Sequence, residues 1–222
     1  MKAMILSAGR GERMMPLTKD TPKPLIKVHD KTLIEHSIDT LKNAAITDVV
    51  INIAYLGEKI QAHLGDGDKF GINIEYSIEQ NALETAGGII QALPAFENAP
   101  FIVMNSDVLC DYDLSALALP NNSLAHLLLI DNPEHNPNGD FSLTGNKITP
   151  PNTQTYTFSG IGLYHPDFFQ SHLHNNGKLP LSALFKEAIN NGQLTGECHL
   201  GYWQDIGTPE RLESANNNSK TL

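Results

Sequence analysis

The residues best suited to chemistry lie near the start of the chain, where a short apolar run, Met4 to Leu6, leads into a glycine-rich turn. Gly9 and Gly11 carry no side chain, so backbone N–H groups can approach an anion closely there. Arg13 and Lys23 add positive charge, and the prolines on both sides of Lys23 stiffen its segment. The pattern indicates a phosphate-binding loop, although it is neither a Walker loop nor a full GxGxxG fingerprint.

Two aspartates are candidates for a metal site. Asp107, in VMNSDVL, follows a predicted buried strand, and Asp205, in GYWQDIGTPERL, comes just before a glycine turn and a helix start. Ligands of open α/β sheets bind outside the carboxyl ends of the strands. Magnesium prefers carboxylate, water and substrate phosphate oxygens, so two aspartates and a nucleotide would suit it. Each aspartate could equally serve as a helix cap or a turn residue.

Other polar residues and glycines suit recognition of a nucleotide or a sugar. Glu79 could accept a hydrogen bond from a base N–H, and Gly87 lies at a predicted helix start where a base or ribose could come close. Asn105 and Asp140 suit recognition of sugar hydroxyls, although each could also be an ordinary turn residue. Gly160 interrupts a predicted strand, which often marks the close approach of a ligand or of another backbone segment.

Hydrophobic periodicity predicts alternating strands and helices, which favours a mostly parallel sheet with right-handed crossovers. The expected strands are 4–6, 48–54, 72–78, 100–105, 124–131 and 157–165, with a hairpin in 140–149. The expected helices are 31–45, 58–64, 85–93, a late helix through 181–188 and a last helix capped by Thr208 with Pro209 at its first position.

Length and composition predict one soluble α/β domain over residues 1–222, with a polar tail at 216–222 that should fray. The net charge of −10 argues against a nucleic-acid partner. No apolar segment approaches the roughly 20 residues of a membrane span. The two cysteines are far apart and lack CxxC spacing, which points to a reducing compartment, so we expect a cytoplasmic protein.

Taken together, several strings resemble the sugar-1-phosphate nucleotidyltransferase family. They are AGRGERMMPLT with TPKPLI, LETAGG, NSD, FSGIGLY and WQDIGTPERL, and they span nearly the whole chain in the family's order. The strings NPEHNPNGDFSLTGN and TFSGIGLYHP look most like the branch of N-acetylmuramic acid α-1-phosphate uridylyltransferases. Departures from many relatives are Ser7 for Ala, Ser106 for Gly and Glu84 for Gly, and the last of these puts the base and ribose contacts in question.

The resemblance implies a nucleotide-diphospho-sugar transferase fold, which is a Rossmann-like, mostly parallel mixed sheet flanked by helices. It assigns the triphosphate and nucleotide pocket to Ala8, Gly9, Gly11, Glu12, Arg13, Lys23, Glu79 and Gly87. It implies that Asn105, Asp140 and Gly160 face the sugar and that Asp107 and Asp205 hold a Mg²⁺ ion. Arg13 and Lys23 would be the catalytic cations.

The resemblance also implies the reaction. The expected partners are a nucleoside triphosphate, with UTP favoured, and a sugar-1-phosphate, with N-acetylmuramic acid α-1-phosphate favoured, and the products are a UDP-sugar and pyrophosphate in peptidoglycan recycling. A hexose-1-phosphate enzyme that uses UTP, dTTP or GTP is the first alternative, and a non-catalytic regulatory homologue is a remote one. We expect a monomer or a weak oligomer.

Overall fold

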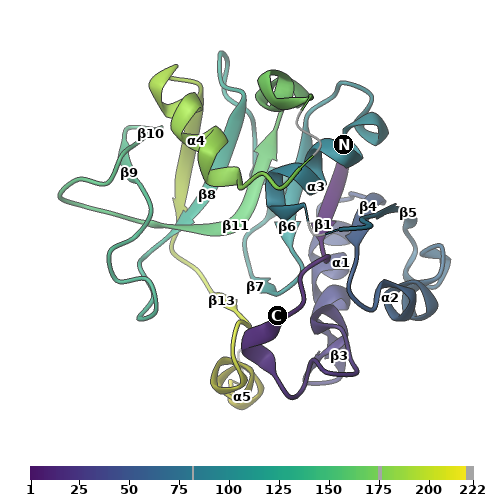
Figure 1. Ribbon diagram of the computed structural model, residues 1–222. Coiled ribbons are helices and arrows are strands. Elements are labelled where there is room, and N and C mark those ends of the chain that lie inside the picture. The colour runs from purple at the N-terminus through teal and green to yellow at the C-terminus, as the bar shows by residue number, and fades with distance from the viewer. Residues whose placement is uncertain (82, 175–176, 219–222) are drawn as a thin grey trace. The chain divides into compact units, whose positions relative to one another are not determined.

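A computed structural model describes residues 1–81, 83–174 and 177–218, which form two compact units (Figure 1). Each unit is built from separate stretches of the chain. Unit 1 consists of Met1, Leu83–Val103 and Ala116–Gly201, and unit 2 consists of Lys2–Ala82, Met104–Ser115 and Tyr202–Leu222. The single domain over 1–222 stays a prediction.

Unit 2 contains three parallel strands in the order β5-β4-β1. They are β1 (Lys2–Leu6), β4 (Asp48–Ile53) and β5 (Asn73–Ile78), as the sequence predicted. β4 is buried after its first residue, which explains its continuous apolar run, whereas the edge strand β5 stays partly exposed and alternates. Because the strands are parallel, their carboxyl ends meet at one edge of the sheet.

The helices of unit 2 begin and end at recognisable signals. In α1 (Leu33–Asn43), Thr32 and Glu35 form a capping box, so the helix starts two residues later than the predicted 31–45. Lys31 and Thr32 belong instead to β3, which pairs with β2 (Lys27–Val28). Helix α2 (Gly57–Leu64) ends at Gly65, which confirms the prediction for 58–64.

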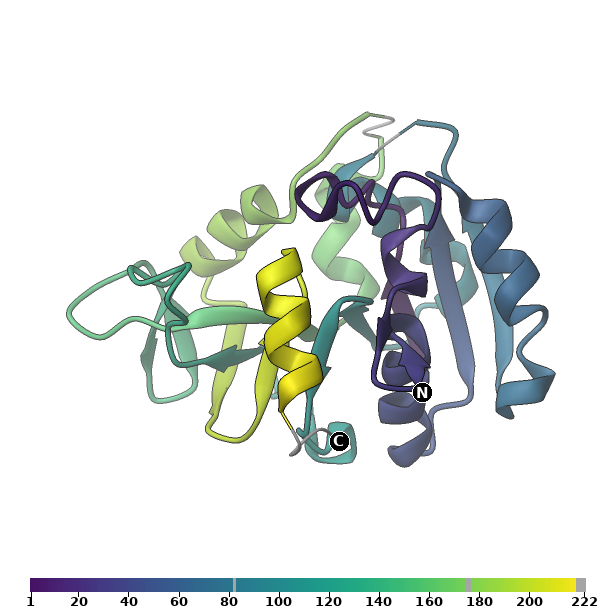
Figure 2. The same cartoon turned by 90° about the horizontal axis from the view of Figure 1, so that it is seen from below.

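The last helix, α5 (Pro209–Asn217, yellow in Figure 2), has the predicted Thr208 cap and Pro209 start. Asn216 and Asn217, at the start of the predicted frayed tail, are helical, and fraying of the tail stays a prediction. The side-chain oxygen of Asn216 accepts a hydrogen bond of 2.7 Å from the backbone N–H of His29. Residues 219–222 lie outside the described residues.

Unit 1 contains a mixed group of strands and two helices. Strand β8 (Ala125–Ile130) pairs antiparallel with β11 (Thr157–Tyr164) and parallel with β12 (Leu194–His199). The hairpin predicted in 140–149 is confirmed as β9 (Ser142–Thr144) and β10 (Lys147–Thr149). The helices are α3 (Glu84–Ala92) and α4 (Leu181–Asn190). β12 was not predicted.

Strand β6 (Phe101–Asn105) belongs to both units, since its last two residues lie in unit 2. The hydrogen-bonded strand order is β5-β4-β1-β6-β11-β8-β12-β10-β9. This nine-stranded mixed sheet with helices confirms the predicted α/β fold class.

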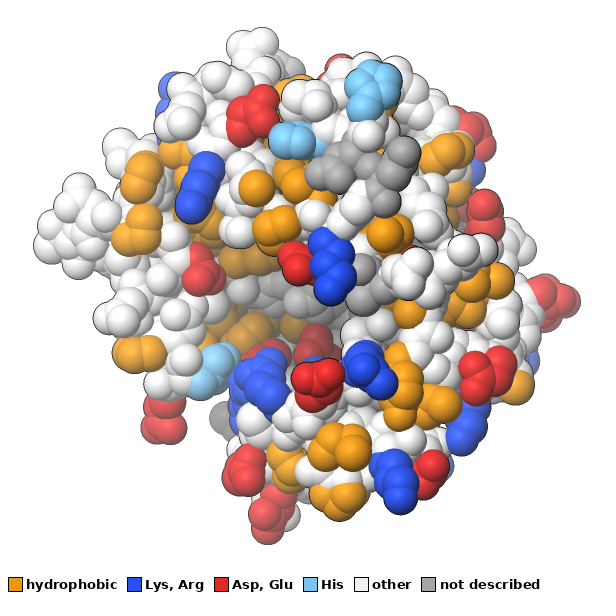
Figure 3. Space-filling view, in the orientation of Figure 1, with side chains coloured by type: hydrophobic (Ala, Val, Ile, Leu, Met, Phe, Trp, Pro, Cys, Tyr) orange, Lys and Arg blue, Asp and Glu red, His pale blue; other side chains and the backbone are white. Residues whose placement is uncertain are grey.

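The described residues contain no helix that is long and apolar enough to cross a membrane. On the face drawn in Figure 3, Lys and Arg side chains are interspersed with Asp and Glu side chains. The expectation that the chain does not bind nucleic acid stays a prediction from its net charge of −10.

Candidate active site

The glycine-rich loop follows β1 and ends in a short 3-10 helix, η1 (Glu12–Met14). Gly11 has φ 63° and precedes this helix, and a Cβ there would lie 3.0 Å from the side chains of Lys23 and Thr18. The Thr18 hydroxyl donates a 2.8 Å hydrogen bond to the Gly11 carbonyl. Gly11 is therefore required by the turn itself, through both its left-handed backbone and its close packing.

Gly9 is different, because the packing of the chain does not explain it. A Cβ at Gly9 would meet no heavy atom of the described residues within 4 Å. Gly9 is also exposed, as expected of a position where a ligand approaches the backbone. Neighbouring Ala8 is partly buried, and the N–H of Ser7 donates a hydrogen bond to the side chain of Asn52 in β4.

The cations of the loop have different surroundings. Arg10 lies over the ring of Tyr55, with 5.3 Å between its guanidinium carbon and the ring centroid. Arg13 is exposed on η1 and makes no hydrogen bond or ion pair with the described residues. Glu12, beside it, is also exposed. The buried Met14 anchors this short helix, so Arg13 stays at the surface, where an anionic ligand could reach it.

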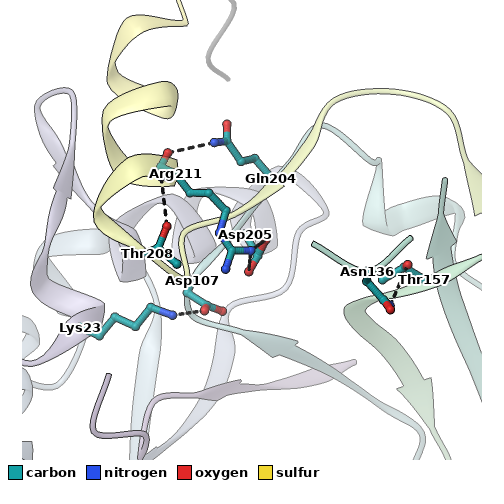
Figure 4. Close-up of polar contacts among 8 residues, drawn as sticks. All are labelled: Lys23, Asp107, Asn136, Thr157, Gln204, Asp205, Thr208 and Arg211. Atoms are coloured by element: carbon teal, nitrogen blue, oxygen red, sulfur yellow. Dashed lines mark hydrogen bonds and ion pairs between the residues drawn. The ribbon is translucent and has the colours of Figure 1, made fainter. Parts of the chain in front are cut away.

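Lys23 is the more constrained of the two predicted catalytic cations. It begins the 3-10 helix η2 (Lys23–Leu25), between the buried Pro22 and Pro24. Its ammonium group forms an ion pair with the carboxylate of Asp107 (Figure 4). The side chains of Lys23 and Asp107 are only 15% and 20% exposed, so this pair is partly shielded from solvent. The structure thus brings a predicted phosphate contact against a predicted metal ligand.

The two predicted metal ligands are brought together by a short antiparallel ladder. Strand β7 (Val108–Cys110) begins directly after Asp107, and β13 (Trp203–Asp205) ends at Asp205. Asp205 lies opposite Val108, and the N–H after Asp205, that of Ile206, donates a 2.8 Å hydrogen bond to the Asp107 carbonyl. The ladder thus places Asp107 and Asp205 on neighbouring strands, and their carboxylate oxygens are of the kind that Mg²⁺ prefers. Three or more potential ligands do not cluster anywhere in the described parts of the chain.

Asp205 has a cationic partner of its own, Arg211 of α5, which the sequence analysis missed. Its Nη1 atom lies 2.5 and 2.6 Å from the two carboxylate oxygens of Asp205 (Figure 4). The sequence did place Arg211 near Asp205, because an N-cap at Thr208 puts Arg211 in the first turn of the helix that follows Asp205. The sequence did not reveal that the side chain turns back toward β13.

Glu79 belongs to a buried hydrogen-bonded chain across the ends of the three parallel strands. The Asn52 side chain accepts from the N–H of Ser7 at 2.8 Å and donates to the Glu79 carboxylate at 2.7 Å. Asn52 is 3% and Glu79 is 5% exposed. The sequence analysis missed Asn52, although a lone amide in the apolar run of β4 was a usable signal. Asn52 therefore ties the start of the glycine-rich loop to the predicted base contact.

The three residues predicted to face the sugar, Asn105, Asp140 and Gly160, have different surroundings. Asn105 ends β6, partly buried, and its side chain makes no hydrogen bond with the described residues. In unit 1, both carboxylate oxygens of Asp140 are engaged, one by the N–H of Phe158 and the other by the Asn136 amide. Gly160 has φ 83° at an irregularity of β11, so the backbone explains this glycine. Their sugar contacts stay predictions.

Helix α3 of unit 1 carries two further positions of interest. A Cβ at Gly87 would lie 3.0 Å from the Gly177 carbonyl, so close packing explains Gly87 without a ligand. Glu84, where many relatives have glycine, has φ 59°. Glu84 thus has a left-handed backbone of the kind that glycine favours, and its carboxylate is exposed.

One pocket of about 650 Å³ lies in unit 2 away from these residues. It is lined by α1 and by the segment that follows β7, and it contains none of the predicted site residues. Cys110 borders it as a buried thiol whose pKa burial raises to about 11, which makes it a poor nucleophile.

Residues 2–221 match the nucleotidyl transferase family, and the chain belongs to that family. It is 46% identical, over 97% of its length and 96% of the relative, to N-acetylmuramate alpha-1-phosphate uridylyltransferase of Neisseria meningitidis serogroup B. It is 32% identical, over 95% of its length, to the mannose-1-phosphate guanyltransferase of Gibberella zeae, of which it spans 62%.

A solved structure supports the fold. The putative glucose-1-phosphate thymidylyltransferase of Bacillus anthracis, crystallised with a sucrose, superposes with a TM-score of 0.85. That match covers 97% of this chain and 94% of the other, with 25% sequence identity. The chain is therefore a nucleotidyltransferase, as the sequence strings predicted.

Proposed function

We propose that this nucleotidyltransferase is Mg²⁺-dependent and joins the uridylyl group of UTP to N-acetylmuramate α-1-phosphate, releasing pyrophosphate. The observation that carries the proposal is the 46% identity over nearly the full length to the uridylyltransferase of that name. The reaction would serve peptidoglycan recycling in the cytoplasm. Retention of Arg13, Lys23, Asp107 and Asp205 argues against a non-catalytic homologue, since such a protein would have no need of all four.

In the proposed reaction, a phosphate oxygen of the sugar-1-phosphate attacks the α-phosphorus in line. The bond from that phosphorus to its bridging oxygen breaks, and its electron pair leaves with pyrophosphate. The attacking oxygen is already an anion, so no general base is needed, and catalysis rests on positioning and charge neutralisation. Bound Mg²⁺ would supply a Lewis acid for the phosphates.

The chain's own residues have separate tasks in this reaction. Asp107 and Asp205, presented by the β7–β13 ladder, would hold the metal. Exposed Arg13 and the shielded Lys23 would offset charge on the α-phosphate and on the leaving pyrophosphate. Backbone N–H groups of residues 8–11 would line the triphosphate, where Gly9 leaves room for its approach.

The choice of base and sugar rests on other residues. Glu79 would accept a hydrogen bond from the base, but uracil N3–H and guanine N1–H are both donors, so Glu79 alone does not select UTP. Asn105 would meet the sugar. The lactyl carboxylate of muramate needs a cation or N–H groups, and exposed Lys178 and the loop 132–139 are the candidates.

A hexose-1-phosphate nucleotidyltransferase is the second candidate, favoured by the 32% identity to a mannose-1-phosphate guanyltransferase. Pyrophosphate release should be measured for UTP, dTTP, GTP and ATP, each with the 1-phosphates of N-acetylmuramate, glucose and mannose. We expect the highest kcat/KM for UTP with the muramate substrate. Activity confined to a hexose-1-phosphate would refute the muramate assignment, and no activity in any combination would support a non-catalytic role.

A further inference from the structure

We infer that Arg211 is a competitor for the metal: it neutralises Asp205 in the metal-free protein and leaves this carboxylate when Mg²⁺ binds with the nucleotide. The inference rests on the proposed metal role of Asp205. Its basis is the bifurcated contact of one guanidinium nitrogen with both Asp205 oxygens, at 2.5 and 2.6 Å, between side chains that are 17% and 18% exposed. A guanidinium in contact with both oxygens offsets the charge of the carboxylate, so Mg²⁺ must compete with Arg211 for Asp205.

The local sequence is built around this ion pair. A Cβ at Gly207 would lie 2.4 Å from Arg211 Nη2 and 3.0 Å from Asp205 Oδ2, so any side chain there would displace the pair. Gly207 is not among the glycines with positive φ, so its absent side chain, rather than its backbone conformation, is what the structure uses. Glycine at this position therefore makes room for the contact of Arg211 with Asp205.

The backbone of Arg211 is also fixed relative to β13. Its N–H donates to the Thr208 hydroxyl, and its carbonyl accepts a 2.9 Å hydrogen bond from the Gln204 amide (Figure 4). The first contact lies within the cap of α5 and the second joins α5 to β13, so Arg211 can release its guanidinium while α5 remains attached to β13 through Gln204. The long side chain then provides the movement.

The charges of two neighbouring ion pairs explain why Arg211 would leave Asp205 when the nucleotide binds together with the metal. Lys23 with Asp107 and Arg211 with Asp205 form two ion pairs whose formal charges cancel. Free Mg²⁺ would have to displace both cations and leave them without an anion. A metal–triphosphate complex brings phosphate oxygens, which a guanidinium can bind in bidentate fashion. Metal-free protein should accordingly bind free Mg²⁺ weakly, and Arg211 should move from a carboxylate to a phosphate.

The first test measures metal binding without nucleotide, with Mn²⁺ as a paramagnetic substitute whose free concentration is read by electron paramagnetic resonance. Arg211→Gln should bind Mn²⁺ about 5- to 150-fold more tightly than wild type, the usual range of coupling between two linked equilibria. Lys31→Gln is the matched control, because Lys31 also pairs with an aspartate, Asp39, in unit 2 but outside the site. It should leave Mn²⁺ affinity within about twofold of wild type. Unchanged or weaker affinity in Arg211→Gln would overturn the inference.

Two further measurements separate this inference from the proposed function. Asp205→Asn should abolish the tight Mn²⁺ binding of the Arg211→Gln background; if Mn²⁺ affinity did not change, the metal site itself would be wrong. In wild type, the NMR signal of the Arg211 side-chain Nε–H should shift when Mg²⁺ is added with UTP, because the guanidinium exchanges a carboxylate for a phosphate. Arg211→Lys, which keeps a cation, should retain the weak Mn²⁺ binding. An Arg211 side-chain signal that Mg²⁺ and UTP leave unchanged, or tight Mn²⁺ binding in Arg211→Lys, would count against release of Arg211.

Discussion

The buried amide of Asn52 provides a sharp test of how the nucleotide loop is positioned. Replacement by leucine removes the acceptor of the Ser7 N–H and the donor to Glu79, whose hydrogen bonds measure 2.8 and 2.7 Å. A buried backbone N–H left without a partner costs about 1–3 kcal/mol, and a hydrogen bond to a charged group contributes about 1.5–3 kcal/mol. Asn52→Leu should therefore lower the free energy of unfolding by roughly 2.5–6 kcal/mol.

The assay is urea denaturation followed by circular dichroism, together with the KM for UTP. Asn73 provides the matched control, because its amide donates to the Asp48 carboxylate at 3.0 Å at an exposed strand start. Asn73→Leu should change stability by no more than about 0.5 kcal/mol. The KM for UTP should rise in Asn52→Leu and stay unchanged in Asn73→Leu, since Asn52 binds the start of the loop whereas Asn73 binds Asp48.

A double-mutant cycle isolates the contact with the carboxylate. When Glu79→Met is combined with Asn52→Leu, the loss should be smaller than the sum of the single losses by about 1.5–3 kcal/mol, since the two side chains share one hydrogen bond. If Asn52→Leu stayed within about 1 kcal/mol of wild type, or matched the exposed control, the buried chain could not be what positions the loop.

Three further predictions concern a glycine pair, a buried histidine and a strained glutamate. Gly9→Ala should leave stability unchanged, because its Cβ meets no described atom within 4 Å, but should lower turnover; Gly11→Ala, at φ 63°, should lose roughly 1–2 kcal/mol of stability. Equal stability losses would refute the different roles of the two glycines. Burial lowers the pKa of His126 below its ordinary 6.5, although a nearby carboxylate opposes this shift. As the pH falls, the unfolded chain therefore binds a proton at this histidine before the folded chain does. Stability is accordingly lost as the pH falls below about 6.5. Urea titrations should show less of this loss in His126→Gln, and an identical pH profile would contradict the assignment. Glu84→Gly, at φ 59°, should at least preserve stability, because relief of backbone strain offsets the entropy cost of glycine. The control Glu213→Gly, at an exposed position of α5, should lose about 1 kcal/mol in the same titration. A comparable loss in both glutamate variants would show that position 84 carries no strain.

The parts of the fold that local sequence encodes were predictable. The apolar run of β4 and the alternation of β5 identified strands, and the Thr208–Pro209 start identified α5, because these signals lie within a few residues of the element they define. β12 was missed, since its stability comes from pairing with β8, a strand distant in sequence. The contact of the Asn216 side chain with the backbone of His29 could not be predicted from the composition of the tail.

The residues of the candidate site likewise fall into those that the sequence predicted and those that only the folded structure revealed. Residue types and spacing were enough to select Asp107 and Asp205, but not to show that each pairs with a cation. Asn52 and Arg211 act through partners that only the folded chain brings close. Conversely, Gly87 stood out as a glycine near a helix start, and the structure explains it by packing against the Gly177 carbonyl.

The most direct test of the central claim is a phosphorus NMR time course of the protein with UTP, Mg²⁺ and N-acetylmuramate α-1-phosphate. The resonances of both substrates should decline together while a sugar nucleotide and pyrophosphate accumulate in equal amounts. The reaction should stop in Asp107→Ala, whose fold is expected to remain intact. Release of inorganic phosphate, pyrophosphate without a sugar nucleotide, or undiminished turnover in Asp107→Ala would contradict the account.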